Sequence, residues 1–275
     1  MINISNLSYH YPNHKAHVLD NLSLTIEDGK IYGLLGENGV GKTTLLGLIC
    51  GILRPSQGSV SINGISSMKR DPKILANLFY VPDEFNLPHI SLKTYVRINA
   101  PFYPSFALDE LNRCLKEFDM PDSIKHLDQL SLGQRKKVML SFAIASGTKT
   151  ILMDEPSNGL DIPSKAQFRK VLATAMTDDR TIVISTHQVH DVEQLLDCVI
   201  IIDNHSILLD KSISQISEEY VFTTLAPGAE SSFDVIYSEP SVGGHNVIAR
   251  RTPDQDETLV NLEMLFNATT KGLIK

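Results

Sequence analysis

The sequence is poor in cysteine, has no excess of basic residues and has no long apolar run. Its three cysteines are far apart and odd in number, which indicates neither a disulfide framework nor a cysteine-based metal site. We expect three buried thiols in a reducing compartment. The net charge is −7, so a nucleic-acid partner, which would need a basic face, is not expected.

A membrane-spanning segment is also missing from the sequence. The longest apolar run, Leu45 to Leu53, contains two glycines and is about half as long as a bilayer span requires. The first residues lack the basic and apolar segments of a secretion signal. We therefore expect a soluble chain, and any association with a membrane would have to come through a partner.

Apolar, strand-like runs alternate with helical stretches along much of the chain. This βαβ order predicts an α/β fold with a mostly parallel sheet covered on both faces. The predicted strands of that sheet are residues 31–35, 150–153, 181–184 and 198–202. Residues 2–11 alternate apolar and polar side chains and predict an edge-type strand, and residues 18–26 repeat the pattern. We expect these two strands to form an antiparallel flank.

Two further regions differ in character from this core. Between about 84 and 148, strand-like runs disappear and helical periodicity dominates, which predicts a helical insert. The tail, 217–275, predicts a small α+β appendage. Its expected strands and helix are residues 220–225, 234–237, 247–249 and 259–269.

A glycine-rich loop joins the strand at 31–35 to a predicted helix at 43–52. The loop reads Gly36-Glu37-Asn38-Gly39-Val40-Gly41-Lys42-Thr43, followed by Thr44. Its glycines let successive backbone N–H groups point at phosphate oxygens, and the helix adds its positive end. Lys42 supplies a point charge for the β- and γ-phosphates, and Thr43 offers a hydroxyl to Mg²⁺. A chance glycine-rich turn is the alternative, but the flanking strand and helix argue against it.

Two adjacent carboxylates, Asp154 and Glu155, end the apolar strand at 150–153. An unpaired charge at the end of a buried strand is costly, so a core role is poorly suited to either. Neighbouring side chains on a strand point in different directions and can do different jobs. We expect Asp154 to hold Mg²⁺ and Glu155 to activate or orient the attacking water.

A third motif lies between these two. It reads Leu130-Ser131-Leu132-Gly133-Gln134 and is followed by three basic residues. Alone, this pattern is also typical of a helix N-cap. In its context it resembles the signature of ABC-type ATPases, usually written LSGGQ, with Leu132 where glycine is usual. The resemblance implies that Ser131 and the Gly133 backbone cap the γ-phosphate of ATP held by another subunit.

Further residues match other motifs of the same family, in the order in which the family carries them. Ser157 and Asp161 belong to a segment that resembles the D-loop, which contacts the second subunit. His187, at the end of a strand, resembles the switch histidine that touches the γ-phosphate. Tyr11 matches the aromatic residue that stacks on adenine, with Tyr9 as the alternative.

One position departs from the family. Glutamine usually contacts Mg²⁺ after the strand that ends at Pro82, but here the residue is Asp83. A carboxylate can bind Mg²⁺, yet it adds negative charge beside a triphosphate. The resemblance also places a docking face for a membrane subunit around Asp83 and residues 88–104. Its aromatic side chains would fit a partner interface or a core: Phe85, Tyr95, Phe102, Tyr103 and Phe106.

The resemblance covers about residues 1–215. It implies a cassette at 1–216 with its helical subdomain at about 84–148, and an appendage at 217–275. It further implies ATP and Mg²⁺ as cofactors and a homodimer, or a pair with a sister cassette. The dimer would drive separately encoded integral membrane transporter subunits from the cytoplasmic face of the cell membrane. The single cassette and trailing segment look most like stand-alone subunits of export-type transporters.

Two other functions fit parts of the pattern. A soluble ATP switch of the same cassette type could act on a ribosome or nucleic acid, but tandem cassettes or a long coiled-coil insert would be expected there. A P-loop kinase acting on a small molecule would share the phosphate loop. The signature-like motif and the strand-end His187 argue against the kinase.

Overall fold

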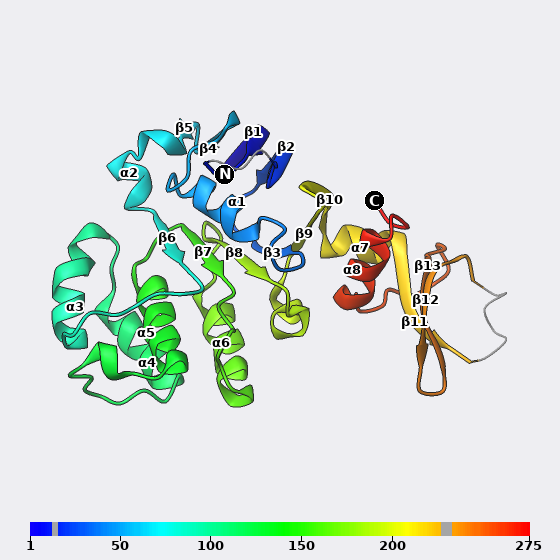
Figure 1. Ribbon diagram of the computed structural model, residues 1–275. Helices are drawn as coiled ribbons and strands as arrows, with labels where there is room; N and C mark the ends of the chain where they lie inside the picture. The colour runs from blue at the N-terminus through cyan, green and yellow to red at the C-terminus, as the bar shows by residue number, and fades with distance from the viewer. Residues whose placement is uncertain (13–15, 227–232) are drawn as a thin grey trace.

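The computed structural model describes residues 1–12, 16–226 and 233–275 (Figure 1). Its central sheet has the strand order β10-β9-β3-β8-β7-β6. Neighbouring strands from β9 to β6 run parallel, and β10 is antiparallel to β9. The strands are β3 (Ile31–Leu35), β6 (Leu78–Val81), β7 (Thr150–Asp154), β8 (Thr181–Thr186), β9 (Cys198–Asp203) and β10 (Ser206–Ser212). The predicted α/β class with a mostly parallel sheet is confirmed.

A second, antiparallel sheet flanks the first and has the order β2-β1-β4-β5. Its strands are β1 (Ile2–Tyr9), β2 (Leu19–Ile26), β4 (Gln57–Ile62) and β5 (Ile65–Ser66). The prediction of an edge strand at the N-terminus was wrong, because β4 pairs with the side of β1 that β2 leaves open. Helix α1 (Lys42–Ile49) contributes to one apolar core with both sheets, and it ends earlier than expected, before Gly51 at φ 68°.

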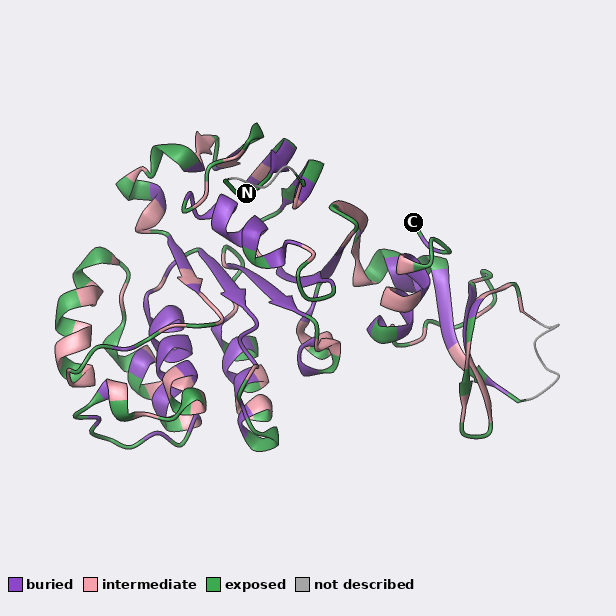
Figure 2. Cartoon of the chain, viewed as in Figure 1, coloured by how far each residue is buried: buried purple, intermediate pink, exposed green. Residues whose placement is uncertain are grey.

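Helices cover the other face of the central sheet, and its strands are buried along most of their length (Figure 2). The predicted helical insert contains α3, α4 and α5, and α6 follows β7 (Figure 1). The elements are α3 (Leu92–Asn99), η2 (Ala100–Phe102), α4 (Leu108–Glu117), η3 (Leu127–Gln129), α5 (Leu132–Ala145) and α6 (Ile162–Ala175). Shorter elements are η1 (Ser67–Lys69), α2 (Pro72–Leu75), η4 (Val189–Asp191) and η5 (Glu193–Leu195).

Most aromatic residues expected at a docking face belong instead to the core. The rings of Tyr95, Tyr103 and Phe106 lie 5.1 to 6.1 Å from the ring of Phe142, measured between centroids. Phe85 also packs against the core. Phe102 is the exception, with 69% of its surface exposed. The aromatic content of this segment therefore serves mainly to join α3 and η2 to α5.

The described part of the tail forms a three-stranded antiparallel sheet, in the order β11-β13-β12, followed by helix α8, and helix α7 leads into it. The elements are α7 (Ile213–Glu219), β11 (Tyr220–Leu225), β12 (Val235–Ser241), β13 (Gly244–Arg250) and α8 (Leu262–Thr270). Helix α8 contacts β12 on one side and β9, β10 and η4 on the other, so it joins the tail to the central sheet (Figure 1). In the described part of the chain, no helix is both long and apolar enough to cross a membrane.

Candidate functional site

The glycine-rich loop lies between β3 and α1, at the carboxyl edge of the central sheet, as its sequence context predicted. Gly39 and Gly41 have φ values of 87° and 109°, a region that side chains disfavour, and Gly41 is the N-cap of α1. Helix α1 begins at Lys42, so its unpaired N–H groups and positive end face the loop. This arrangement is suited to binding phosphate.

The ammonium group of Lys42 lies inside this loop. It donates to the carbonyl oxygens of Gly36, at 2.7 Å, and Glu37, at 3.1 Å, and lies 3.5 Å from Oε1 of Glu155. Burial lowers the pKa of Lys42, while the Glu155 carboxylate opposes that shift. Because this buried ammonium group is only partly neutralised by Glu155, phosphate oxygens bound in the loop would stabilise its charge.

Asp154 is the last residue of β7 and Glu155 follows it, and their side chains contact different partners. Asp154 accepts from the hydroxyl of Ser185, on the neighbouring strand β8, and its Oδ2 lies 3.5 Å from the hydroxyl of Tyr80. Thr43, the second residue of α1, is exposed. Carboxylate and hydroxyl oxygens are the ligands that Mg²⁺ prefers. The side-chain oxygens of Asp154 and Thr43 are therefore of the chemical type that a magnesium ion takes.

Glu155 is held in an unusual conformation. Its φ is 43°, its backbone N–H donates to the carbonyl of Ser185 at 3.0 Å, and its side chain is buried. Oε1 accepts from Nδ1 of His187 at 2.9 Å. Oε2 is buried and has no hydrogen-bond partner among the described residues. A buried carboxylate oxygen without a donor is costly, so it is well suited to receive a water molecule.

The two tyrosines considered for adenine stacking have different surroundings. Tyr9 is buried in the core of the antiparallel flank. Tyr11 is 41% exposed, and its hydroxyl lies 2.9 Å from the hydroxyl of Thr44 on α1. Tyr11 is thus the aromatic ring beside the phosphate loop, and Tyr9 supports it by an edge-to-face contact at 5.1 Å between ring centroids.

The signature-like residues form the start of α5. Ser131 is the N-cap, and it exchanges hydrogen bonds with Gln134 in a capping box. Leu132 is 52% exposed and lies beside Gly159, since a Cβ added at that glycine would come within 2.9 Å of Leu132 Cδ2. Among the described residues, no hydrogen bond joins 131–134 to the phosphate loop.

The D-loop segment follows Glu155 directly. Ser157 is buried, whereas Asp161 is exposed and caps α6 by accepting from the N–H of Ser164 at 2.9 Å. Hydrogen bonds from the side chain of Ser164 and from its backbone N–H hold the pKa of Asp161 below its usual value. In this chain, Asp161 therefore has a structural role in starting α6.

Asp83 pairs with a residue that the sequence did not single out. Nζ of Lys136 lies 2.9 Å from Oδ1 of Asp83 and donates to the carbonyl of Glu155 at 2.7 Å. Lys136 is almost wholly buried, although its sequence position, inside a basic run, is typical of an exposed face. The amide of Asn158 lies 3.4 Å from the same Asp83 oxygen. The Asp83 carboxylate thus contacts both the ammonium group of Lys136 on α5 and the amide of Asn158.

The tail also reaches the phosphate loop. Phe266 of α8 lines a cavity of about 370 Å³ together with residues of the loop and of the strand end that carries His187. These wall residues are Leu35, Gly36, Glu37, Asn38, Thr186, His187 and Val189. This arrangement could not be predicted from the sequence, because an apolar residue on a predicted helix could pack equally well in any core.

The fold and these groups define a P-loop protein that binds a nucleoside triphosphate. The family model for ABC transporters matches residues 19–158. YtrB of Bacillus subtilis (strain 168), an ABC transporter ATP-binding protein, is 31% identical over 213 residues, which are 76% of this chain and 72% of YtrB. SkfE of the same strain, the SkfA peptide export ATP-binding protein, is 31% identical over 80% of this chain and 92% of its own.

A solved structure described as the ATP binding subunit of an ABC transporter shares the fold. Its TM-score is 0.70 at 24% identity, and the match covers 78% of this chain and 91% of the other. From the family match and these relatives, the chain belongs to the ABC transporter family of ATP-hydrolysing cassettes.

Proposed function

We propose that this chain is the ATP-hydrolysing subunit of a membrane transporter and works as a homodimer that closes on two ATP molecules. The observation that carries the proposal is the convergence of Lys42, Glu155 and His187 at one edge of the sheet. The exposed start of α5, with Ser131 as its N-cap, would complement that edge in a second copy.

In this proposal each residue of the site has a distinct role. Lys42 exchanges its loop carbonyls for the β- and γ-phosphates, and the N–H groups at the start of α1 bind the same oxygens. Tyr11 stacks on adenine. Thr43 and Asp154 hold Mg²⁺, which neutralises charge on the phosphates when bound. Asp83 stays paired with Lys136 and is not a metal ligand.

Hydrolysis would use the free oxygen of Glu155. Oε2 accepts a proton from a water molecule whose oxygen attacks the γ-phosphorus, while the bond from that phosphorus to the bridging oxygen of ADP breaks. His187 fixes the other oxygen of Glu155 at 2.9 Å and so keeps the carboxylate aimed at the phosphate edge. The residues 131–134 and the D-loop of a second copy would close the site.

The relatives favour a transporter over a ribosome or nucleic-acid partner, because YtrB is named as an ABC transporter ATP-binding protein and SkfE as a peptide export ATP-binding protein. We place this chain on the cytoplasmic face of the cell membrane, where ATP is available. The docking face would centre on two exposed apolar side chains of the helical subdomain, Ile98 and Phe102. Export is the direction we propose, from the relative SkfE, which is named for peptide export.

Affinity purification from the host's detergent-extracted membranes tests the partner. The Glu155→Gln chain, held with ATP, should co-purify a chain with several apolar spans. A matched variant with Ile98→Glu and Phe102→Glu should lose that chain and keep its own ATP binding, because both side chains lie away from the site. Recovery of ribosomal proteins or nucleic acid in place of a membrane chain would contradict the proposed partner.

A further inference from the structure

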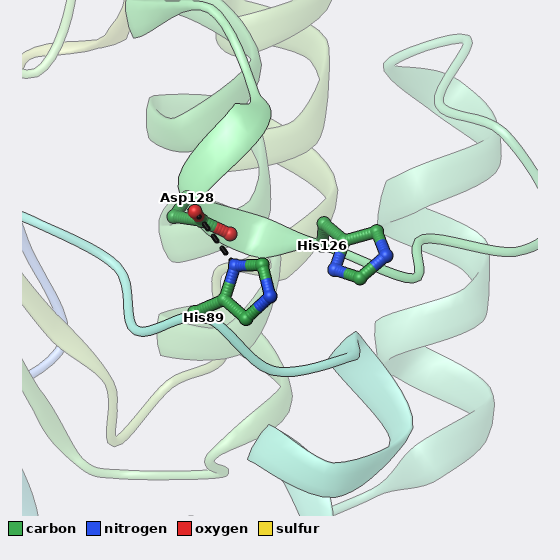
Figure 3. A group of neighbouring side chains, drawn as sticks. All are labelled: His89, His126 and Asp128. Atoms are coloured by element: carbon green, nitrogen blue, oxygen red, sulfur yellow. Dashed lines mark hydrogen bonds and ion pairs between the residues drawn. The ribbon is translucent and has the colours of Figure 1, made fainter.

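Three side chains outside the nucleotide site gather on the surface of the helical subdomain: His89, His126 and Asp128 (Figure 3). One ligand atom from each lies within 4.8 Å of the others. Nδ1 of His89 is 2.9 Å from Oδ2 of Asp128, and the rings of His89 and His126 stack with their centroids 4.8 Å apart. The group therefore has two imidazoles and one carboxylate facing a common point.

The segments that carry these residues are fixed to each other by the backbone. His89 lies between β6 and α3, and His126 and Asp128 flank Leu127 at the start of η3. The N–H of Leu127 donates to the carbonyl of Ile90 at 3.0 Å, and the side chain of Leu127 is fully buried. Because the two segments are already joined, little conformational entropy remains to be lost when the three side chains bind a common ligand.

We propose that His89, His126 and Asp128 form a binding site for a divalent transition-metal ion of borderline softness, with Zn²⁺ as the representative. Two imidazole nitrogens and a carboxylate oxygen are a ligand set that such ions take, with water completing the coordination. Separately, Oδ1 of Asp128 is buried and lacks a hydrogen-bond partner among the described residues. A cation beside this carboxylate offsets that unpaired acceptor.

A plain surface ion pair explains less of the arrangement. It accounts for the bond between His89 and Asp128, but not for a second imidazole stacked on the first beside the same carboxylate. The cysteines do not compete for the ion, because all three are buried. Burial raises the pKa of Cys50 and of Cys114 to about 12, which keeps both thiols protonated.

The site lies between two segments that lead to functional residues, so a bound ion would affect how these segments are held together. Asp128 precedes Ser131 by three residues, and His89 follows Asp83 by six. A bound ion would link the segment that leaves Asp83 to the segment that enters the signature-like loop. It should therefore slow hydrogen exchange of the Leu127 amide, whose hydrogen bond to Ile90 spans the same two segments.

Calorimetric titration of the metal-free full chain with ZnCl₂ tests the proposal. Millimolar Mg²⁺ is included to fill oxygen-only sites, and nucleotide is left out. We expect one ion per chain at micromolar affinity, weakened at least about tenfold by His89→Ala, His126→Ala or Asp128→Asn. His126 is exposed, so its replacement should leave the fold and the ATP affinity unchanged.

Two other histidine sites provide the controls. His190 lies 3.5 and 2.9 Å from the carboxylates of Glu193 and Glu263, and His17 lies 4.0 Å from Asp20. His190→Ala and His17→Ala should bind Zn²⁺ like the wild type. Unchanged affinity in the three site variants, or loss of binding in either control, would overturn the proposal. A Zn²⁺-independent exchange rate at Leu127 would overturn the proposed link between the segments.

Discussion

The ammonium group of Lys136 lies 2.9 Å from the carboxylate of Asp83 and 2.7 Å from the backbone carbonyl of Glu155. A single buried cation thus connects the position where this chain departs from its family to the residue proposed to activate water. The pair places a counter-charge beside the aspartate that occupies the usual glutamine position. Its strength and its effect on the nucleotide site can be measured separately.

Breaking this pair should destabilise the fold. Lys136→Gln leaves Asp83 without its counter-charge, and Asp83→Gln leaves a buried ammonium facing a neutral amide. Since Asp83 is 37% exposed at its side chain, we expect each single change to cost about 2 kcal/mol, below the range for fully buried pairs. The double change to glutamine should cost less than the sum. Urea unfolding of the four proteins gives the coupling energy, and additive losses would show that the pair is not an energetic unit.

The same pairing predicts how ATP binding depends on Mg²⁺. Because the Asp83 carboxylate is held by Lys136 and lies 3.4 Å from the Asn158 amide, we expect it to stay away from the metal. Asp83→Gln should then leave the Mg²⁺ dependence of ATP affinity unchanged in the isolated chain and alter only partner-stimulated activity. Titration of ATP at several Mg²⁺ concentrations decides the point. A weaker Mg²⁺ dependence in the variant would place Asp83 at the metal.

Lys42→Ala should abolish tight ATP binding. The substitution removes the ammonium group inside the loop, and no other lysine or arginine side chain hydrogen-bonds to the carbonyls of Gly36 and Glu37 in the described part of the chain. The backbone donors at the start of α1 remain, so weak binding should persist. Direct titration with ATP measures the change. Wild-type affinity would mean that the loop does not hold the phosphates in the way we propose.

The contact between His190 of η4 and Glu263 of α8 should depend on pH. Hydrogen bonds to Glu193 and Glu263 raise the pKa of His190 above its usual value. A raised folded-state pKa means that the contact stabilises the fold fully below the unfolded pKa and loses this effect as pH rises through the folded pKa. Glu263→Gln should lower the pKa of His190, as followed by NMR titration of the ring. Lys271→Gln, also on the tail, is the control; an unchanged pKa in Glu263→Gln would exclude the contact in solution.

The sequence predicted the features that depend on neighbouring residues along the chain. Gly36 to Thr43 could be placed because the strand before and the helix after the loop adjoin it. The interior position of β1 could not be predicted, since its second neighbour, β4, is about fifty residues away and leaves no mark on the alternation of β1. Membership of the ABC-type ATPase family could be predicted from the motifs at 36–43, 130–134 and 154–155 taken together.

The residues whose roles could not be predicted from the sequence have one feature in common: their surroundings come from segments far apart in the chain. Lys136 looks like part of a solvated basic run, and only the packing of α5 beneath Glu155 buries it. In the sequence, Phe266 is one of several apolar residues on a predicted helix. It lies near His187 only because α8 packs against η4 in the fold. The group His89, His126 and Asp128 joins two segments about forty residues apart, so its spacing matches no local metal-binding pattern.

In the cycle we propose, two copies of this chain close on ATP, and hydrolysis that depends on Glu155 opens them again. Glu155→Gln should keep ATP affinity and slow hydrolysis by about 10²-fold or more, the scale of a lost general base. ATP would then persist at the interface. Light scattering of this variant with Mg²⁺ should show the mass of a monomer without nucleotide and of a dimer with ATP. A variant that hydrolyses ATP at the wild-type rate and stays monomeric with ATP would contradict the account.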